Sequence, residues 1–157
     1  LPGIPSFKWE STRGLGGSFA YNAQETAADI LSASELVDYL VDTVAKNGNV
    51  LINIGPDSYG RIPVIQQTPL LGLGDWMALN GEAIYATRPW IRFKNERGRD
   101  LRYTQSETAL YAIVAGAVAD SFTIEQPGIA WRSVEVLGAE GALPYVAAWC
   151  FAVALSR

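Results

Sequence analysis

The chain has 157 residues, 49% of them hydrophobic and 18% charged, with a formal net charge of −4. This composition is typical of one globular domain or two small ones, and the mild negative charge gives no electrostatic reason to bind nucleic acid. The chain has no histidine and one cysteine, which excludes histidine-dependent triads and the usual zinc sites within these residues, so we expect neither a metal nor a cofactor.

The beginning of the chain carries no targeting signal. Residues 1–5 lack the starting methionine, the basic region and the apolar region of a signal peptide. The compartment therefore stays open between secreted, periplasmic and cytoplasmic, and we expect the chain to be a fragment. No apolar stretch approaches the roughly 20 residues of a membrane span, so no membrane contact is expected. Residues 1–30 are rich in glycine, serine and aromatic side chains and predict an irregular loop.

A helix is predicted over residues 33–46. Ser32 and Glu35 fit a capping box, and apolar residues follow at helical spacing. The Asn47-Gly48 pair is a typical helix stop.

A strand and a second helix are predicted next. Residues 49–54 are β-branched and almost wholly apolar, which favours a parallel strand buried on both faces. Asn53 is the polar exception, and it either points into a site or satisfies a neighbouring loop. A helix is expected over 63–79, where Pro69 should kink or restart it with Thr68 as the cap. The order helix, strand, helix is typical of one slice of an α/β repeat.

The pattern changes near residues 87–89. Beyond this point come short β-type runs separated by Gly, Asp, Asn and Pro, which predict an antiparallel sheet or sandwich: residues 90–96, 101–105, 109–118, 121–126, 133–137 and 149–155. We therefore divide the chain into residues 1–87 and 88–157. The first part has too few strands to close an eight-stranded barrel. Its open edges predict a homo-oligomer, a covering partner or a missing N-terminal half.

Glu10 is the most suggestive candidate for chemistry. It lies in a segment with Phe7, Trp9, Phe19 and Tyr21, and a carboxyl group against aromatic walls is desolvated, which favours its neutral form and suits a general acid. The structural alternative is a loop glutamate bonded to backbone amides.

Four stretches, in this order, resemble the C-terminal part of the α-L-fucosidases of glycoside hydrolase family 29. They are Lys8-Trp9-Glu10 with Ser18-Phe19-Ala20-Tyr21-Asn22; Glu35-Leu36-Val37 through Asn47-Gly48-Asn49 to Gly55-Pro56; Gly60-Arg61-Ile62-Pro63; and Leu73-Gly74-Asp75-Trp76 with Asn80-Gly81-Glu82 to Trp90. The resemblance implies the C-terminal slice of a (β/α)8-like barrel over residues 1–87, followed by a reduced antiparallel β-sandwich over 88–157.

The resemblance also implies retaining hydrolysis of α-L-fucosides, with a fucosylated glycan as substrate. Glu10 maps onto the acid/base, while the nucleophilic Asp and the fucose-binding histidines lie upstream of residue 1. We place Trp9, Phe19, Tyr21 and Asn53 beside Glu10 as substrate-binding residues. Phe19 stands where the family has Trp and keeps the apolar wall without the indole N–H.

Other positions depart from a complete catalytic set. Asp29 and Asp57 are available carboxylates outside any nucleophile motif, and Glu82 is expected to be a structural partner of backbone amides. Tyr59 stands where the family often has Asp, which we interpret as a surface change. A non-catalytic β-sandwich module that binds sugar or another partner and carries a barrel remnant is the alternative function. A third possibility is a fragment that folds only with a partner chain.

Overall fold

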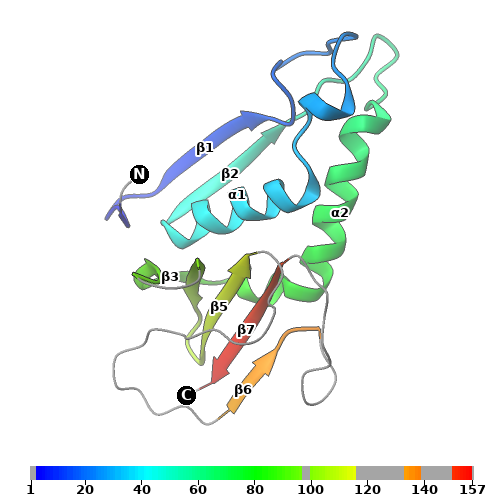
Figure 1. The fold of residues 1–157 in the computed structure, drawn as a ribbon. Helices are drawn as coiled ribbons and strands as arrows, with labels where there is room; N and C mark the ends of the chain where they lie inside the picture. Colours follow the sequence, from blue (N-terminus) through cyan, green and yellow to red (C-terminus); the bar gives the residue numbers. More distant parts are fainter. Residues whose placement is uncertain (1–2, 97–99, 116–132, 139–149, 157) are drawn as a thin grey trace.

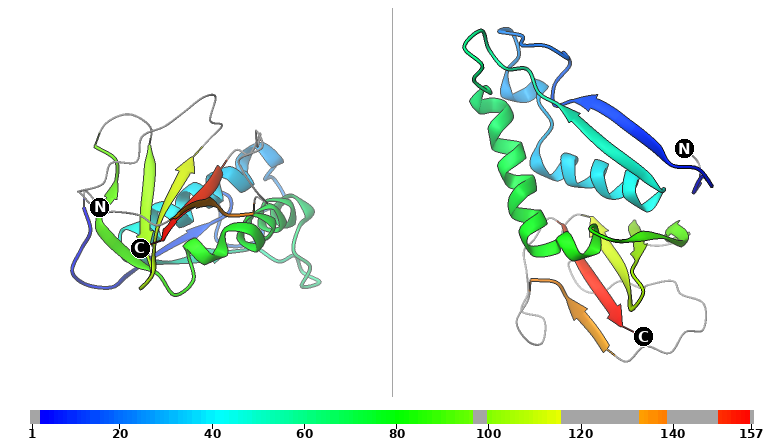
Figure 2. Two further views of the ribbon diagram at one scale, coloured as in Figure 1. Left: turned by 90° about the horizontal axis from the view of Figure 1, so that it is seen from below. Right: turned by 180° about the vertical axis from the view of Figure 1, so that it is seen from behind.

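The computed structural model describes residues 3–96, 100–115, 133–138 and 150–156. An α/β half lies against an antiparallel sheet, and α1 (Ala33–Ala45) lies between the two (Figure 1). Helix α2 (Val64–Asn80) runs from the loop end of the α/β half toward the antiparallel sheet (Figure 2). Neither helix combines the length and the apolar character that crossing a bilayer requires, among the residues described.

The α/β half contains a pair of parallel strands. Strand β1 (Trp9–Gly14) pairs with β2 (Gly48–Asn53), and Trp9 lies opposite Gly48 in the register. Because α1 connects the two strands, the segment is a β-α-β unit. The parallel strand predicted over 49–54 is confirmed, but the irregular loop expected over residues 1–30 is wrong for β1, which forms a strand by pairing with β2.

Helix α1 begins where the sequence predicts, and its predicted caps are present. The Ser32 side chain accepts from the Glu35 backbone N–H, and the Glu35 carboxylate accepts from the Ser32 backbone, so the capping box is present. Asn47 adopts a φ of 68°, the left-handed conformation that commonly ends a helix. The helix reaches Ala45, one residue short of the prediction.

Helix α2 does not restart at Pro69. It runs unbroken to Asn80, with Pro63 as its N-cap and Pro69 buried inside it. The Thr68 hydroxyl donates to the Val64 carbonyl at 3.1 Å, a bond inside the same helix, so Thr68 caps nothing. The expected restart is therefore wrong. A short 3-10 turn, η2 (Gly81–Ala83), follows the helix, and another, η1 (Ala27–Asp29), precedes α1.

The second half forms one five-stranded antiparallel sheet in the described residues. Its order is β3-β4-β5-β7-β6, with strands β3 (Arg88–Lys94), β4 (Leu101–Gln105), β5 (Ala109–Ala115), β6 (Ser133–Val136) and β7 (Cys150–Ser156). The antiparallel prediction is confirmed for these segments. The strand predicted over 121–126 and the end of the one predicted over 109–118 lie outside the described residues.

Strand β5 joins two hydrophobic cores. Its alternate residues Ala109, Tyr111 and Ile113 pack with Val37, Val41 and Trp76 of the helices. Leu110, Ala112 and Val114 point to the other side and pack with Trp90, Leu101, Tyr103 and Val153 of the sheet. A third core of Leu15, Ile30 and Leu36 lies in the α/β half, where Ile52 of β2 packs against it. The helices therefore lie on the sheet through a shared apolar core.

Candidate active site

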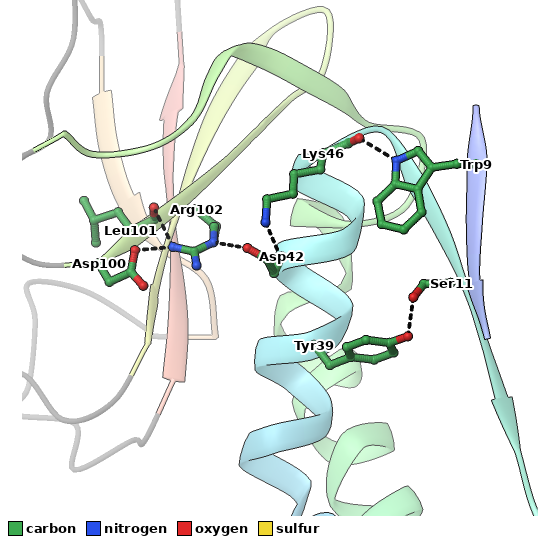
Figure 3. A network of polar contacts seen from close by, with 8 residues as sticks. All are labelled: Trp9, Ser11, Tyr39, Asp42, Lys46, Asp100, Leu101 and Arg102. Atoms are coloured by element: carbon green, nitrogen blue, oxygen red, sulfur yellow. Dashed lines mark hydrogen bonds and ion pairs between the residues drawn. The ribbon is translucent and has the colours of Figure 1, made fainter. Parts of the chain in front are cut away.

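One face of the parallel strands is held by α1. The Trp9 indole N–H donates to the Lys46 carbonyl at 2.8 Å, and the Ser11 hydroxyl shares a hydrogen bond with the Tyr39 hydroxyl (Figure 3). The Arg13 guanidinium lies 5.2 Å from the centre of the Tyr39 ring. Since side chains alternate along a strand, Trp9 lies on the opposite face from Glu10. Its contacts position β1 on the helix.

The opposite face, which we call the open face, consists of Glu10 and Thr12 from β1 and Asn49 and Leu51 from β2. All four side chains are exposed, and Leu51 is 51% exposed. The expected burial of β2 on both faces is thus wrong, because in the part of the chain that the structure describes one face packs on α1 and the third core while the open face stays exposed. The expected aromatic enclosure of Glu10 is not found either.

Glu10 and Asn53 lie toward opposite ends of the strands. Glu10 is the second residue of β1 and its register partner is Asn49, whereas Asn53 is the last residue of β2. Asn49 and Asn53 are four positions apart along the strand, which corresponds to about 13 Å. The predicted site residues therefore do not form one cluster: Phe19, Tyr21 and Asn53 gather at the C-terminal ends of the strands, away from Glu10.

The loop after β1 is attached to the end of β2. The Asn53 side-chain amide donates to the Phe19 carbonyl at 2.6 Å, and the Leu15 N–H donates to the Asn53 carbonyl at 3.2 Å. A Cβ on Gly55 would come within 2.8 Å of the backbone of Ala20 and Tyr21, so glycine permits this close approach. Asn53 thus satisfies a neighbouring loop, one of the two roles considered for it.

The loop presents two aromatic side chains at this end of the molecule. Phe19 is 63% exposed and Tyr21 is 49% exposed. The loop is also braced internally: the Ser18 N–H donates to the Glu25 carboxylate at 3.0 Å, and the Asn22 amide donates to the Ser18 hydroxyl at 3.1 Å. The structure thus places two exposed aromatic side chains on a braced loop beside the strand ends.

The two spare carboxylates have local structural partners. Asp29 accepts from the Thr26 N–H and hydroxyl, both at 2.8 Å, and the backbone bond is the main cause that lowers its pKa. Asp57 accepts from the backbone of Tyr59 and Arg61 and from the Arg61 guanidinium. The backbone N–H of Arg61 is the main cause that lowers the pKa of Asp57. Both carboxylates hold turns together.

Glu82 also has a structural partner, but a different one from that predicted. The Tyr111 hydroxyl donates to the Glu82 Oε1 at 2.7 Å. Burial, followed by this bond, raises the pKa of Tyr111. The contact connects η2 to β5 across 29 residues of sequence, so Glu82 fastens the antiparallel sheet to the end of α2.

A charged network joins α1 to β4. Asp42 accepts from the Lys46 ammonium group at 2.6 Å and from the Arg102 Nε at 2.7 Å, while Arg102 also pairs with Asp100 (Figure 3). Burial acts to raise the pKa of Asp42, but the hydrogen bonds from Lys46 and Arg102 outweigh it and hold the pKa below its usual value. The spacing of Asp42 and Lys46 was a sequence signal for their pair, but nothing local pointed to Arg102.

No cluster of three His, Cys, Asp or Glu residues suited to a metal ion occurs in the described ranges.

A profile of the family described as Alpha-L-fucosidase matches residues 2–82. The chain belongs to the α-L-fucosidase family.

Individual α-L-fucosidases are similar to this chain over more residues than the family profile covers. The tissue alpha-L-fucosidase of Macaca fascicularis is 40% identical over 111 residues, which cover 70% of this chain and 24% of the relative. A solved alpha-L-fucosidase superposes with a TM-score of 0.84 at 30% identity, over 100% of this chain and 40% of its own. The crystal structure of Thermotoga maritima alpha-fucosidase in complex with fucose gives a TM-score of 0.74 at 34% identity, over 98% of this chain and 37% of its own.

The chain thus spans about a quarter of the curated relative and two fifths or less of these solved enzymes. The structural similarity includes the antiparallel sheet, where the profile match has ended.

Proposed function

We propose that this chain is the C-terminal part of a retaining α-L-fucosidase that hydrolyses terminal α-L-fucose from glycans. The observation that carries the proposal is the family match over residues 2–82, which includes both loops at the C-terminal ends of the parallel strands. Enzymes built on parallel β/α barrels carry out chemistry at this end of their strands. The similar Thermotoga maritima enzyme was solved with fucose.

In this proposal β1, α1, β2 and α2 are the last two β/α units of a (β/α)8-like barrel, over residues 1–87. The antiparallel sheet over 88–157 is then part of a reduced β-sandwich. The open face would point into the barrel, where strands from the N-terminal part of the enzyme cover it. Leu51 on this face is 51% exposed, so the 157-residue chain by itself should self-associate. A compact monomer in sedimentation at micromolar concentration would contradict this assignment.

The substrate end of the site consists of Phe19, Tyr21 and Asn53. Phe19 and Tyr21 would form apolar walls beside the fucose, and Asn53 would hold the Phe19 backbone through its 2.6 Å hydrogen bond. Trp9 would not contact the substrate in this proposal. It would position β1, because its indole N–H donates to the Lys46 carbonyl at the end of α1. These roles need no metal or cofactor.

The assignment of Glu10 as acid/base stays a prediction. A retaining glycosidase places its two carboxyl groups about 5–5.5 Å apart. Glu10 lies about 13 Å along the strands from Asn53, so its role as acid/base requires the carboxylate of the nucleophile to lie beside Glu10 itself. Otherwise the acid/base, like the nucleophile, lies outside these 157 residues.

The test is hydrolysis of methyl and aryl α-L-fucosides by the protein expressed from its full coding sequence, with the anomer of released fucose followed by NMR. Release of α-L-fucose as the first product supports retention. An absence of hydrolysis with retained fucose binding would favour the non-catalytic sugar-binding module.

The variant Glu10→Ala decides the role of Glu10. If Glu10 is the acid/base, kcat for substrates with poor leaving groups falls by about 10²–10⁴-fold, activated aryl fucosides lose less in the first step, and azide partly restores turnover. Unchanged kinetics would remove Glu10 from the mechanism.

A further inference from the structure

A compact turn over residues 57–61 follows β2, and hydrogen bonds connect its first residue to its last ones. The Asp57 N–H donates to the Arg61 carbonyl and the Gly60 N–H donates to the Asp57 carbonyl, both at 2.9 Å. The Asp57 Oδ1 accepts from the N–H groups of Tyr59 at 2.8 Å and Arg61 at 3.0 Å. Gly60 adopts a φ of 77°, which favours glycine. The turn is therefore a fixed support.

Tyr59 is the side chain that this turn presents to solvent. It is 82% exposed, and the Arg61 guanidinium lies 5.0 Å from the centre of its ring. Arg61 is itself held by the Asp57 carboxylate, through Nε at 2.9 Å and Nη2 at 2.8 Å. One face of the ring is thus backed by a cation that is paired with Asp57, and the ring is available to a ligand from the solvent side.

The turn lies at the same end of the molecule as the loop that carries Phe19 and Tyr21. Both loops follow the C-terminal ends of the parallel strands and lie at that end of the α/β half (Figures 1 and 2). Gly55, just before the turn, touches the backbone of Ala20 and Tyr21. Tyr59 is therefore carried by a turn that follows the same strand ends as the loop of the proposed substrate end.

We propose that Tyr59 is a stacking platform for the sugar residue to which fucose is attached. This inference rests on the proposed function. A pyranose ring presents weakly positive C–H bonds on one face, and these are attracted to the negative face of an aromatic ring. With fucose against Phe19 and Tyr21, the next sugar of a glycan extends outward toward the turn that carries Tyr59. Arg61 and Asp57 position the ring before the glycan arrives, which reduces the entropy lost on binding.

The experiment compares 2′-fucosyllactose with methyl α-L-fucoside in the full-length protein, because only the first has a sugar beyond fucose. In Tyr59→Ala, the ratio of kcat/KM for 2′-fucosyllactose to that for methyl fucoside should fall by about 2- to 12-fold, which corresponds to a stacking contact of roughly 0.5–1.5 kcal/mol. Tyr59→Phe keeps the ring and should keep the ratio. Tyr85→Ala is the matched control, since Tyr85 is 69% exposed but follows the opposite end of α2. An unchanged ratio in Tyr59→Ala overturns the proposal.

Lactose binding, followed by saturation-transfer NMR, separates this proposal from the proposed function. If neither fucoside is cleaved, the fucosidase function fails. If only methyl fucoside is cleaved, the function stands and lactose binding decides the role of Tyr59. In both cases a lactose signal that is present in the native protein and in Tyr59→Phe, but lost in Tyr59→Ala, supports the platform. A lactose signal that is absent, or equal in all variants, overturns it.

Discussion

Replacing Gly48 by alanine tests the contact between β1 and α1 most directly. A Cβ at this position would lie 2.7 Å from Thr43 Cγ2, 2.7 Å from Trp9 Cε2 and 2.8 Å from Trp9 Cζ2. Carbon atoms prefer separations of about 3.5–4.0 Å, so the indole must move by roughly 1 Å. That movement draws its N–H away from the Lys46 carbonyl, which it meets at 2.8 Å.

The expected cost can be built from these contacts. Overpacking typically destabilises by about 1–3 kcal/mol, and a lost hydrogen bond adds about 0.5–1.5 kcal/mol. The smaller conformational freedom of the unfolded alanine chain offsets about 0.4–1 kcal/mol. We therefore expect Gly48→Ala to lower the free energy of unfolding by about 2 kcal/mol, measured by urea unfolding with tryptophan fluorescence and circular dichroism.

Two further variants make the result specific. Gly74→Ala, in α2, meets no atom within 4 Å and should stabilise the protein by up to about 1 kcal/mol, because alanine favours the helix. Trp9→Phe removes the part of the indole that clashes, so the double variant with Gly48→Ala should lose less stability than the two single losses together. Additive losses, or a Gly48→Ala protein as stable as the native one, would refute the reasoning.

The remaining predictions concern the charged network and the loop after β1. A double-mutant cycle of Arg102→Met and Asp42→Asn should give a coupling of about 1–2 kcal/mol, between surface and buried values, since their side chains are 20% and 32% exposed; a coupling near zero contradicts it. Because the folded-state pKa of Asp42 is lowered, its stabilisation is present above about pH 4 and is lost as the pH falls through that folded value. The stability difference between native protein and Asp42→Asn should therefore shrink in acid; a constant difference refutes this. The pKa of the neighbouring Asp38 is raised by burial, so Asp38 favours folding as the pH falls. It does so in both proteins and largely cancels in the difference. Asn53→Ala should lower kcat/KM for fucosides about fivefold, as for one lost hydrogen bond, whereas Asn49→Ala should not; equal effects would contradict the role of Asn53.

The sequence predicted those elements whose signals are local. The Ser32–Glu35 capping box and the Asn47 stop define α1, and the short, almost wholly apolar run of β5 matches a strand covered on both sides. In the candidate site, the grouping of Phe19, Tyr21 and Asn53 came from the family resemblance, because β1 itself was not predicted as a strand.

The features that sequence reasoning missed depend on distant partners. The face of β1 toward α1 consists of Trp9, Ser11 and Arg13, so the sequence of this segment does not have the apolar pattern of a strand. The hydrogen-bond partners of Trp9 and Ser11 lie 37 and 28 residues away along the chain. Pro69 looked like a break, yet its ring is buried inside a continuous helix. The position of Glu10 relative to Asn53 required the register of β1 on β2, which no single segment contains.

The two-sided packing of β5 has a consequence for synthesis on the ribosome. Val37 and Val41 of α1 form part of their core with Tyr111 and Ile113, which emerge about 70 residues later, after roughly 4–14 s of translation. During that interval the helix face with Val37 and Val41 lacks its partners on β5 and has only those on α2, such as Trp76. The core between α1 and the sheet is complete only when β5 has been synthesised. The first half of the chain therefore reaches its final packing only after the second half has emerged.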